Sequence, residues 1–547
     1  MNLIKFLFRS SFQLMIAALA IGFLSGSSSA GLIALISYAV AHFSKNLPLS
    51  LILGFAGLAL SALLTSWLVR VILIKLSQEA VFQLQMNLSR QILASELTYL
   101  EKTGSSQLLA ALTDDIQAIA DAVYILPFLC INLAIITGCF AYIAWLSWQV
   151  FLIVSSLSFL TIFAFRFLLR RGRKLLTLAR EDRDYLFQDF RTLTEGIKEL
   201  KLHEQKRQDF LQEDLQINAS RFRHHSTEGL SLLAFTDSVG KFVFFFAIGL
   251  VLFIIPKFIV LSPLALSSYV LTYTYLLGPF ENIVNKLPII TKADVALQKL
   301  KMLGLSLSSH AEQLKPTQNY HLSWQQLKLQ NVTHIYLGEI EDIHFTLGPI
   351  NLEFKPGEIV FIIGGNGSGK STLAKLITGL YTPECGEIWL DKIIIDASQR
   401  EWYRQHFSVI FSDFYLFNRL LGLDAEKLNE QTQYYLKLLK LEHKITINQG
   451  RFSTTSLSQG QRKRLALLTA YLEDRPIYLF DEWAADQDPS FKNIFYTEFL
   501  PQLKAQGKLI LAITHDDHYF SVADRIIKLN SGQIESDQQI VNKIAKA

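Results

Sequence analysis

The chain contains the segment Ile359-Val-Phe-Ile-Ile-Gly364-Gly-Asn-Gly-Ser-Gly-Lys-Ser371, an apolar run that ends in the pattern G-x-x-x-x-G-K-S. A strand that leads directly into such a loop, followed by a helix, is the phosphate-binding arrangement of nucleotide-binding α/β domains. The glycines let the backbone bend so that N–H groups point inward, the lysine reaches the β- and γ-phosphates, and the serine offers its hydroxyl to Mg²⁺. The expected phosphate-binding residues are Gly364, Asn366, Gly367, Ser368, Gly369, Lys370, Ser371 and Thr372.

The composition predicts a membrane domain in the first half of the chain. Half of the 547 residues are hydrophobic and only 18% are charged, whereas soluble domains carry about 25% charged residues. Before residue 290 we count six apolar runs long enough to cross a bilayer, which takes about 20 residues each. These runs lie near Phe12–Phe43, Leu49–Leu76, Ala122–Ser147, Trp148–Leu169, Leu230–Pro256 and Ser262–Leu287.

The connections between these runs predict the orientation in the membrane. The third and fourth runs meet in a tight turn at Ser147-Trp148, so the longer connections 79–121 and 170–229 share the opposite face. The connection after 170 is rich in Lys and Arg, whereas the other face offers only Lys45 and Lys257. Because basic connections stay in the cytoplasm, we expect both termini and the nucleotide-binding domain to be cytoplasmic.

The first run has an alternative interpretation as a signal peptide. Lys5 and Arg9 precede the apolar stretch Phe12–Leu24, and Ala30 follows a serine cluster that resembles a cleavage site. The apolar pattern continues to Val40, which favours a first membrane span.

The cysteines and the net charge exclude several classes of protein. Cys130, Cys139 and Cys385 form no C-x-x-C pair, so neither a disulfide framework nor a zinc site is predicted. The net charge of +4 is small and is explained by basic residues that flank the membrane runs. Nucleic-acid binding is therefore not predicted.

The second half reads as a compact α/β domain after a linker. We divide the chain into a membrane domain (1–290), a polar and irregular linker (291–322) and a nucleotide-binding domain (323–547). Apolar strands alternate with helical patterns, which is typical of a largely parallel sheet. The expected strands are Leu327–Val332, Ile359–Ile363, Ile388–Leu390, Ile477–Phe480 and Leu509–Ile513.

Two carboxylates follow the strand that ends at Phe480. Asp481 suits the coordination shell of Mg²⁺, and Glu482 lies where a carboxylate can polarise the water that attacks the γ-phosphate. A strand ending in Asp-Glu is a weak signal alone. Together with the phosphate loop earlier in the chain, this Asp-Glu pair predicts nucleotide hydrolysis.

The segment Leu457-Ser-Gln-Gly-Gln461 lies between these two motifs and differs at one position, Gln459, from Leu-Ser-Gly-Gly-Gln. On these three motifs the chain resembles the ATP-binding cassette (ABC) family, which implies ATP and Mg²⁺ as ligands. In that family the pentapeptide contacts the γ-phosphate held by the opposite subunit, so the resemblance implies a homodimer with two equivalent sites. It also implies roles for Ser458, Gly460 and Gln461 across the interface, Asp488 in the D-loop, His515 at the γ-phosphate and Tyr336 against adenine.

One position departs from the family pattern. Where the family has a glutamine that touches Mg²⁺, this chain has Ser412, and Asp413 next to it is an alternative. Ser412 is expected to reach the metal directly or through water.

A membrane half followed by one cassette resembles the exporter-type architecture, which implies that segments 109–116 and 194–202 dock on the cassettes. Ordinary solvated helix is the alternative for both segments. The sequences of residues 481–489 and 514–520 are similar to the cyclic-peptide exporter group, which includes exporters of pyoverdine precursor, syringomycin-type lipopeptides and a lasso-peptide microcin. The resemblance implies a bacterial inner membrane and outward movement of peptide-like cargo. Two alternatives stay open, namely an importer for a siderophore-like ligand on the same architecture and a membrane-anchored regulatory ATPase.

Ionisable residues within membrane runs usually face a cavity or a partner. The candidate cargo-cavity residues are Arg70, Asp237, Lys241, Tyr273 and Glu281. Asp237 and Lys241 are four residues apart on one helix, so mutual pairing is the alternative to cargo binding. Arg70 and Arg166 can also extend to the lipid headgroups.

Overall fold

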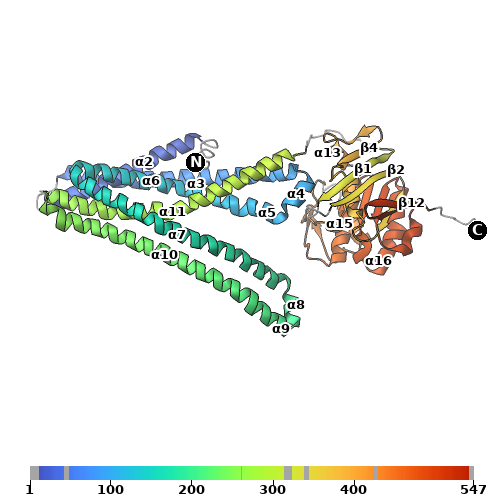
Figure 1. Cartoon of the computed structure of the whole chain (residues 1–547). Helices are drawn as coiled ribbons and strands as arrows, with labels where there is room; N and C mark the ends of the chain where they lie inside the picture. The colour runs from blue at the N-terminus through green and yellow to red at the C-terminus, as the bar shows by residue number, and fades with distance from the viewer. Residues whose placement is uncertain are drawn as a thin grey trace, which may run out of the picture. The chain divides into compact units, whose positions relative to one another are not determined.

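A computed structural model describes residues 12–41, 48–259, 262–312, 323–337, 344–423 and 429–540 (Figure 1). Lys5, Arg9, Lys45 and the expected linker residues 313–322 lie outside the described residues. The chain divides into two compact units. A membrane unit comprises the described residues up to 87 together with 109–302, and a cassette unit comprises 88–108 together with those from 303 onward.

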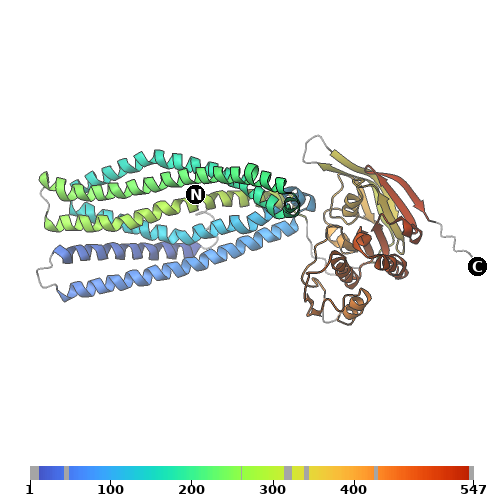
Figure 2. The same ribbon diagram turned by 90° about the horizontal axis from the view of Figure 1, so that it is seen from below.

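Long helices build the membrane unit, with α7 packed along α10 and α2 along α6 (Figure 2). They are α2 (Phe12–Ala41), α3 (Leu49–Ala94), α6 (Ile116–Leu146), α7 (Trp148–Glu195), α10 (Gln216–Gly249) and α11 (Pro263–Ser309). Its shorter segments are η1 (Ala111–Asp115), α8 (Ile197–Leu202), α9 (Glu204–Asp209), η2 (Phe210–Leu215), η3 (Leu250–Ile254) and η4 (Ile255–Lys257), and α5 (Ser105–Ala110) begins in the cassette unit and ends in this one.

The predicted turn between the third and fourth membrane runs is present. Ser147 has an extended backbone and separates α6 from α7. The buried hydroxyl of Tyr269, on α11, donates to the carbonyl oxygens of Ile143 and Ser147 at 2.8 and 2.7 Å. Each carbonyl oxygen also accepts a backbone N–H, Ile143 from Ser147 at 3.2 Å and Ser147 from Phe151 at 3.1 Å. The tyrosine therefore adds a second hydrogen bond to each carbonyl and ties α11 to the turn.

Four helical stretches among the described residues are long and apolar enough to cross a membrane, namely Ile16–Val40, Leu49–Ala94, Ser105–Leu146 and Glu204–Lys257. They cover the first, second, third and fifth predicted runs. The fourth and sixth runs lie in the continuous helices α7 and α11, which are not among the four. The count of six spans therefore stays a prediction.

The expectation of irregular chain from residue 291 is wrong, because α11 continues to Ser309. Its last turns carry an apolar stripe at helical spacing, and the stripe is buried at Ala293, Ala296, Leu297 and Leu300. Burial of one face holds this segment in a helix despite its polar composition.

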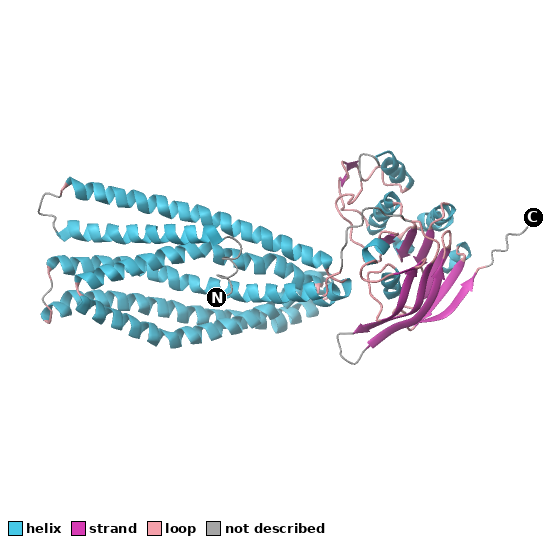
Figure 3. Cartoon of the chain, turned by 90° about the horizontal axis from the view of Figure 1, so that it is seen from above, coloured by secondary structure: helices cyan, strands magenta, loops and turns pink. Residues whose placement is uncertain are grey.

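The cassette unit contains two main sheets (Figure 3). A six-stranded sheet has the order β12-β11-β3-β10-β9-β6, in which only β12 is antiparallel to its neighbour. A four-stranded antiparallel sheet has the order β2-β1-β4-β5. The strands are β1 (Leu327–Leu337), β2 (His344–Phe354), β3 (Ile359–Gly364), β4 (Cys385–Leu390), β5 (Ile393–Ile394), β6 (Phe407–Ile410), β7 (Ile447–Asn448), β8 (Arg451–Phe452), β9 (Ile477–Asp481), β10 (Leu509–Ile513), β11 (Arg525–Asn530) and β12 (Gln533–Gln539).

All five expected strands exist, but the expectation of one parallel sheet is wrong for two of them. The runs at 327–332 and 388–390 belong to the antiparallel sheet, where β1 alternates between buried and exposed residues. Strands β9 and β10, buried throughout, and β3, buried over its first four residues, form the centre of the parallel sheet. This difference follows the rule that parallel strands are buried on both faces.

Both faces of the parallel sheet are covered. Along β3, Phe361 belongs to a core shared with helices, whereas Val360 and Ile362 belong to a core shared with β1 and β2. The helical elements are α12 (Lys370–Ile377), α13 (Arg400–Arg404), α14 (Asn429–Leu438), α15 (Gln459–Glu473), η5 (Trp483–Asp486), α16 (Pro489–Ile494), η6 (Phe495–Phe499), α17 (Leu500–Ala505) and η7 (Asp517–Val522).

A segment from the connection between the second and third predicted membrane runs is part of the cassette unit. It includes the end of α3 and the short helix α4 (Leu97–Thr103). Glu101 on α4 accepts hydrogen bonds from Lys375 Nζ, at 2.7 Å, and from the Tyr381 hydroxyl. Tyr99 stacks on His310 with ring centroids 4.5 Å apart. The expected docking segment 109–116 lies in the membrane unit, and its docking on a cassette stays a prediction.

Candidate functional site

The phosphate loop has the backbone shape that its glycines predict. Gly364 has a φ of 154°, and a Cβ there would overlap the carbonyl oxygen of Leu529 on β11. Gly369 has a φ of 99° and begins α12 at Lys370. Lys370 is 6% exposed, and its Nζ donates to the carbonyl oxygens of Gly364 and Gly365 at 2.9 Å each. The lysine thus lies across the mouth of the loop, where a triphosphate would meet it.

Two buried oxygens beside the loop have no partner among the described residues. They are Ser368 Oγ and Asp481 Oδ1. An unpaired polar atom in a buried position costs free energy unless a ligand satisfies it. Asp481 is 1% exposed, and its other oxygen accepts from Ser412 Oγ at 3.4 Å.

The surroundings of Asp481 fit a divalent cation. Burial raises the pKa of its carboxyl, hydrogen bonds from Ser371 and Ser412 act in the opposite direction, and the neighbouring Glu482 charge adds to the rise. A cation stabilises the ionised carboxylate and so removes this penalty. Asp481, Ser371 and Ser412 are therefore the residues that would hold Mg²⁺, whereas the alternative, Asp413, is exposed.

Glu482 lies at the turn after β9 with a left-handed backbone, at a φ of 50°. Its N–H donates to the carbonyl oxygen of Ile513 on β10 at 3.1 Å. Its carboxylate Oε1 lies 3.2 Å from His515 Nε2, and both side chains are partly exposed. The structure therefore brings together Glu482 and His515, 33 residues apart in the sequence, at the carboxyl ends of adjacent parallel strands.

Two supporting residues were not predicted from the sequence. Lys463 is 3% exposed and bonds the Glu482 carbonyl oxygen at 2.9 Å and the Asp486 carboxylate at 2.7 Å. Trp483 is buried, and its indole N–H donates to the Lys463 carbonyl oxygen. These contacts fix the turn that carries Glu482. A tryptophan directly after the Asp-Glu pair was the available signal.

The pentapeptide forms the start of α15. Ser458 caps this helix in a capping box with Gln461. Gln487 Nε2 donates to the Gly460 carbonyl oxygen at 3.0 Å, and a Cβ on Gly460 would lie 3.0 Å from the Asp486 carbonyl oxygen. Among the described residues no hydrogen bond joins Ser458, Gly460 or Gln461 to the phosphate loop of the same chain.

Arg464 ties the pentapeptide helix to the D-loop. It donates from Nε to Gln487 at 2.9 Å and from Nη2 to the Asp488 carboxylate. Asp488 also caps α16 and accepts from Phe491 N at 3.0 Å. Hydrogen bonds from Ser490 and Phe491, together with the Arg464 charge, lower the pKa of Asp488 to about 2. The carboxylate is therefore ionised at any working pH.

Tyr336 lies on β1 opposite Phe345 of β2. Paired residues on antiparallel strands point to the same face, and the Phe345 ring lies against Gly369 of the phosphate loop. Tyr336 is 53% exposed. Its ring is therefore accessible on the sheet face nearest the loop, as adenine stacking requires.

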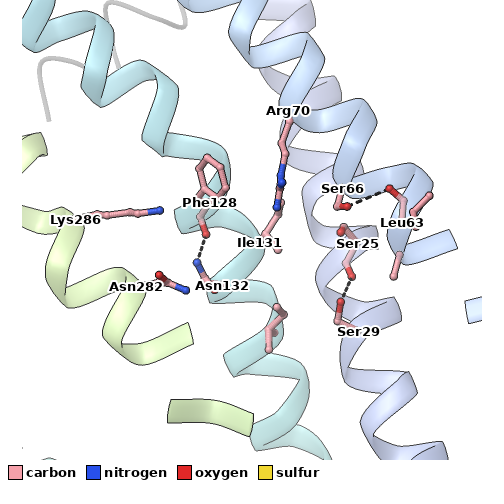
Figure 4. A pocket seen from close by; sticks show the side chains of 12 residues that line it. Ser25, Ser29, Leu63, Ser66, Arg70, Phe128, Ile131, Asn132, Asn282 and Lys286 are labelled. Atoms are coloured by element: carbon pink, nitrogen blue, oxygen red, sulfur yellow. Dashed lines mark hydrogen bonds between the residues drawn. The ribbon is translucent and has the colours of Figure 1, made fainter. Parts of the chain in front are cut away.

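The five candidate cargo residues do not form a single site. Lys241 pairs with Asp237 at 3.0 Å and with Glu281 at 3.4 Å. Tyr273 is buried against Phe244 with ring centroids 4.8 Å apart. Of the five candidates, only Arg70 lines the cavity of about 500 Å³ in the membrane unit (Figure 4). The side chain of Arg166 lies outside the described part of the structure.

Comparisons with known proteins agree with this division of the chain. The sequence profile of the ABC transporter transmembrane region matches residues 12–280, and that of the ABC transporter matches residues 347–485. The ATP-binding protein SyrD of Pseudomonas syringae pv. syringae is 38% identical over 98% of this chain and 96% of its own length.

Two further relatives match over part of their length. The nisin transport ATP-binding protein NisT of Lactococcus lactis subsp. lactis is 31% identical over 38% of this chain and 37% of its own length. The leukotoxin translocation ATP-binding protein LktB of Mannheimia haemolytica is 29% identical over 45% of this chain and 37% of its own length. With a full-length relative, both family profiles and the assembled phosphate site, the chain belongs to the ABC transporter family and couples ATP hydrolysis to transport.

Proposed function

We propose that this protein exports a peptide-like cargo from the bacterial cytoplasm and works as a homodimer in the inner membrane. The observation that carries the proposal is the full-length likeness to SyrD, together with the sequence similarity to the cyclic-peptide exporter group. The relatives named for nisin transport and leukotoxin translocation support the exporter class.

The geometry supports a hydrolytic role for Glu482. Its carboxylate is partly exposed beside His515, so it can accept a proton from water at the end of the β9 strand. Asp481 is buried and, with Ser371 and Ser412, would hold Mg²⁺, which would neutralise charge on the phosphates. Lys370 exchanges its loop carbonyl acceptors for the β- and γ-phosphate oxygens. His515 then stabilises the γ-phosphate while Tyr336 stacks on adenine.

The second half of each ATP site comes from the partner in this proposal. Ser458, Gly460 and Gln461 have no bond to the phosphate loop of their own chain, as described above. Two ATP molecules would draw the cassettes of two copies together, and hydrolysis would release them. The membrane helices then alternate between inward-open and outward-open states.

The test is ATP-dependent movement of a labelled cyclic peptide into inside-out vesicles, with Glu482→Gln as the blank. Accumulation that requires both ATP and Glu482 supports export. Uptake only into right-side-out vesicles loaded with ATP would show an importer. ATP turnover that no peptide alters, with no movement in either orientation, would favour a regulatory ATPase.

A further inference from the structure

The cavity in the membrane unit is lined by residues from four helices, α2, α3, α6 and α11 (Figure 4). Its volume of about 500 Å³ falls within the range of small-molecule sites, about 300–1,000 Å³. The wall is mostly polar. It consists of Ser25, Ser29, Ala62, Leu63, Ser66, Arg70, Phe128, Ile131, Asn132, Ile135, Asn282 and Lys286.

Two cations face one aromatic ring in this wall. The Arg70 guanidinium lies 5.1 Å from the centre of the Phe128 ring, and Lys286 Nζ lies 4.1 Å from it. They come from α3 and α11, and Phe128 lies between them on α6 (Figure 4). A ring face stabilises a cation by about 0.5–2 kcal/mol, which only partly offsets the repulsion between two positive charges held at one site.

Neither cation has an acidic partner. The cavity wall contains no Asp or Glu, and within the described part of the chain no salt bridge or hydrogen bond engages Arg70 or Lys286. Lys241 in the same unit differs from these two cations, because the carboxylates of Asp237 and Glu281 pair with it. The chain therefore supplies counter-charges for one membrane cation and leaves two others available in a cavity.

Arg70 is exposed and Lys286 is half-buried at this cavity, and ionisable side chains within a membrane domain are costly unless they are paired or functional. Several polar neighbours are already committed to their own helices. Ser29 donates to the Ser25 carbonyl oxygen, Ser66 to that of Leu63, and Asn132 to that of Phe128. The strongest free donors of the wall are thus the guanidinium and the ammonium, both of which match a carboxylate or phosphate group.

We propose that this cavity binds one anionic group of the cargo, a carboxylate or a phosphate, at the wall formed by Arg70 and Lys286, with the apolar part beside it resting near Phe128. The cavity is too small for a whole cyclic peptide, so it selects for an acidic end or side chain. The inference rests on the proposed function, since it assigns the substrate class of the same transporter.

The test is equilibrium binding to the full-length protein in phosphatidylcholine nanodiscs without ATP. The probes are a dansyl-labelled acyl-glycine with a free carboxylate and its uncharged methyl ester. Wild type should bind the acid about 10- to 100-fold more tightly than the ester. Arg70→Gln and Lys286→Gln should each reduce that preference, and Arg70→Lys should retain part of it.

Two matched controls remove one cation from each of the same helices outside the cavity. Lys75→Gln on α3 and Lys292→Gln on α11 should leave the preference for the acid unchanged. Because Arg70 and Lys286 have no acidic partner, their removal should not lower the thermal midpoint of unfolding. A lowered midpoint would show that both cations are structural.

Three outcomes would overturn the proposal. They are equal binding of acid and ester, an equal loss in the control variants, and loss of acid binding when phosphatidylglycerol replaces part of the neutral lipid. The last would assign the site to a lipid headgroup. Since binding is measured without ATP, a retained acid preference beside failed vesicle transport would refute export alone, and transport without acid preference would refute this site alone.

Discussion

At the level of single residues, Glu482 carries the clearest prediction. Glu482→Gln keeps the size and the hydrogen bond to His515 but cannot accept a proton, so ATP turnover should fall about 10²- to 10⁴-fold while ATP binding persists. Phosphate release and nucleotide binding measured on the same preparation check this. Glu498→Gln, an exposed carboxylate of η6, is the matched control and should keep wild-type turnover. Near-normal turnover in Glu482→Gln would remove Glu482 from the role of base.

The buried carboxylate of Asp481 should destabilise the protein without metal, although metal-dependent hydrolysis needs it. Burial raises its pKa above the ordinary value of 3.8, so the folded state disfavours the charged form. The resulting penalty is absent below the unfolded pKa and is fully present once the pH exceeds the folded one. Without Mg²⁺ and nucleotide, Asp481→Asn should therefore raise the unfolding midpoint by about 2–4 °C at pH 8.

The same Asp481→Asn variant should lose this advantage as the pH falls through the raised pKa of Asp481, because the folded wild-type carboxyl then becomes protonated and neutral, like the amide. It should also lose Mg²⁺-dependent ATP hydrolysis. Scanning fluorimetry across pH, with and without metal, separates the two effects. A lower midpoint at pH 8 would contradict the assignment of Asp481 as a buried, metal-dependent carboxylate.

At the level of elements, α4 depends on a charged contact with α12. Glu101 bonds Lys375 and Tyr381, and burial followed by the Glu101 hydrogen bond raises the pKa of Tyr381 to about 12. Glu101→Gln should weaken the docking of α4 by about 1 kcal/mol, since the pair is partly exposed. Amide hydrogen exchange of peptides spanning residues 97–103 should then be about fivefold faster.

A surface pair on α7 provides the control for that experiment. Arg191 and Glu195 are 76% and 66% exposed and lie four residues apart. Such pairs contribute little, so Glu195→Gln should not change exchange in α7. Unchanged exchange of α4 in Glu101→Gln would mean that the stacking of Tyr99 on His310 holds the helix without the ion pair.

The ATP site was more predictable than the membrane site, for physical reasons. Phosphate chemistry fixes residue types at fixed spacing, so the loop, Asp481 and Glu482 were predicted from the sequence. Lys463 and Trp483 act through hydrogen bonds to backbone carbonyl oxygens. No sequence motif specifies such contacts by residue spacing. In the membrane unit, pairing of Lys241 depends on Glu281 from another helix, and Lys286 was missed because its cavity exists only once four helices pack together.

The buried apolar runs were correctly predicted as strands of the parallel sheet. The sheet assignment was wrong where, as in β1, buried and exposed residues alternate along the strand. The pattern of β1 fits any half-buried strand, so its sequence does not specify which sheet it joins. The end of α11 was missed because polar residues outnumber the buried stripe at Ala293, Ala296 and Leu297. Whether such a segment is helical depends on tertiary packing, which its composition does not show.

At the level of the whole molecule, the proposed homodimer predicts complementation between two inactive variants. Lys370→Ala destroys the phosphate loop, and Ser458→Arg should block the neighbouring loop across the interface. Each variant alone is expected to lack ATP turnover, whereas a mixed dimer contains one intact site and should regain part of it. Two different affinity tags confirm mixed assembly. An inactive mixture despite proven assembly, or activity of Ser458→Arg alone, would contradict sites built from two copies.

The length of α3 has a mechanical consequence. The helix has 46 residues without an internal proline, so at 1.5 Å per residue it is about 70 Å long, more than twice the roughly 30 Å of the hydrocarbon layer. It ends in the cassette unit, whereas α11 contains Pro279 and Pro288, where a helix can bend. An unbroken rod of this length is a lever arm. A tilt of about 10° at one end moves the other end by about 12 Å, so a small rotation at the nucleotide end is converted into travel comparable to the width of a helix.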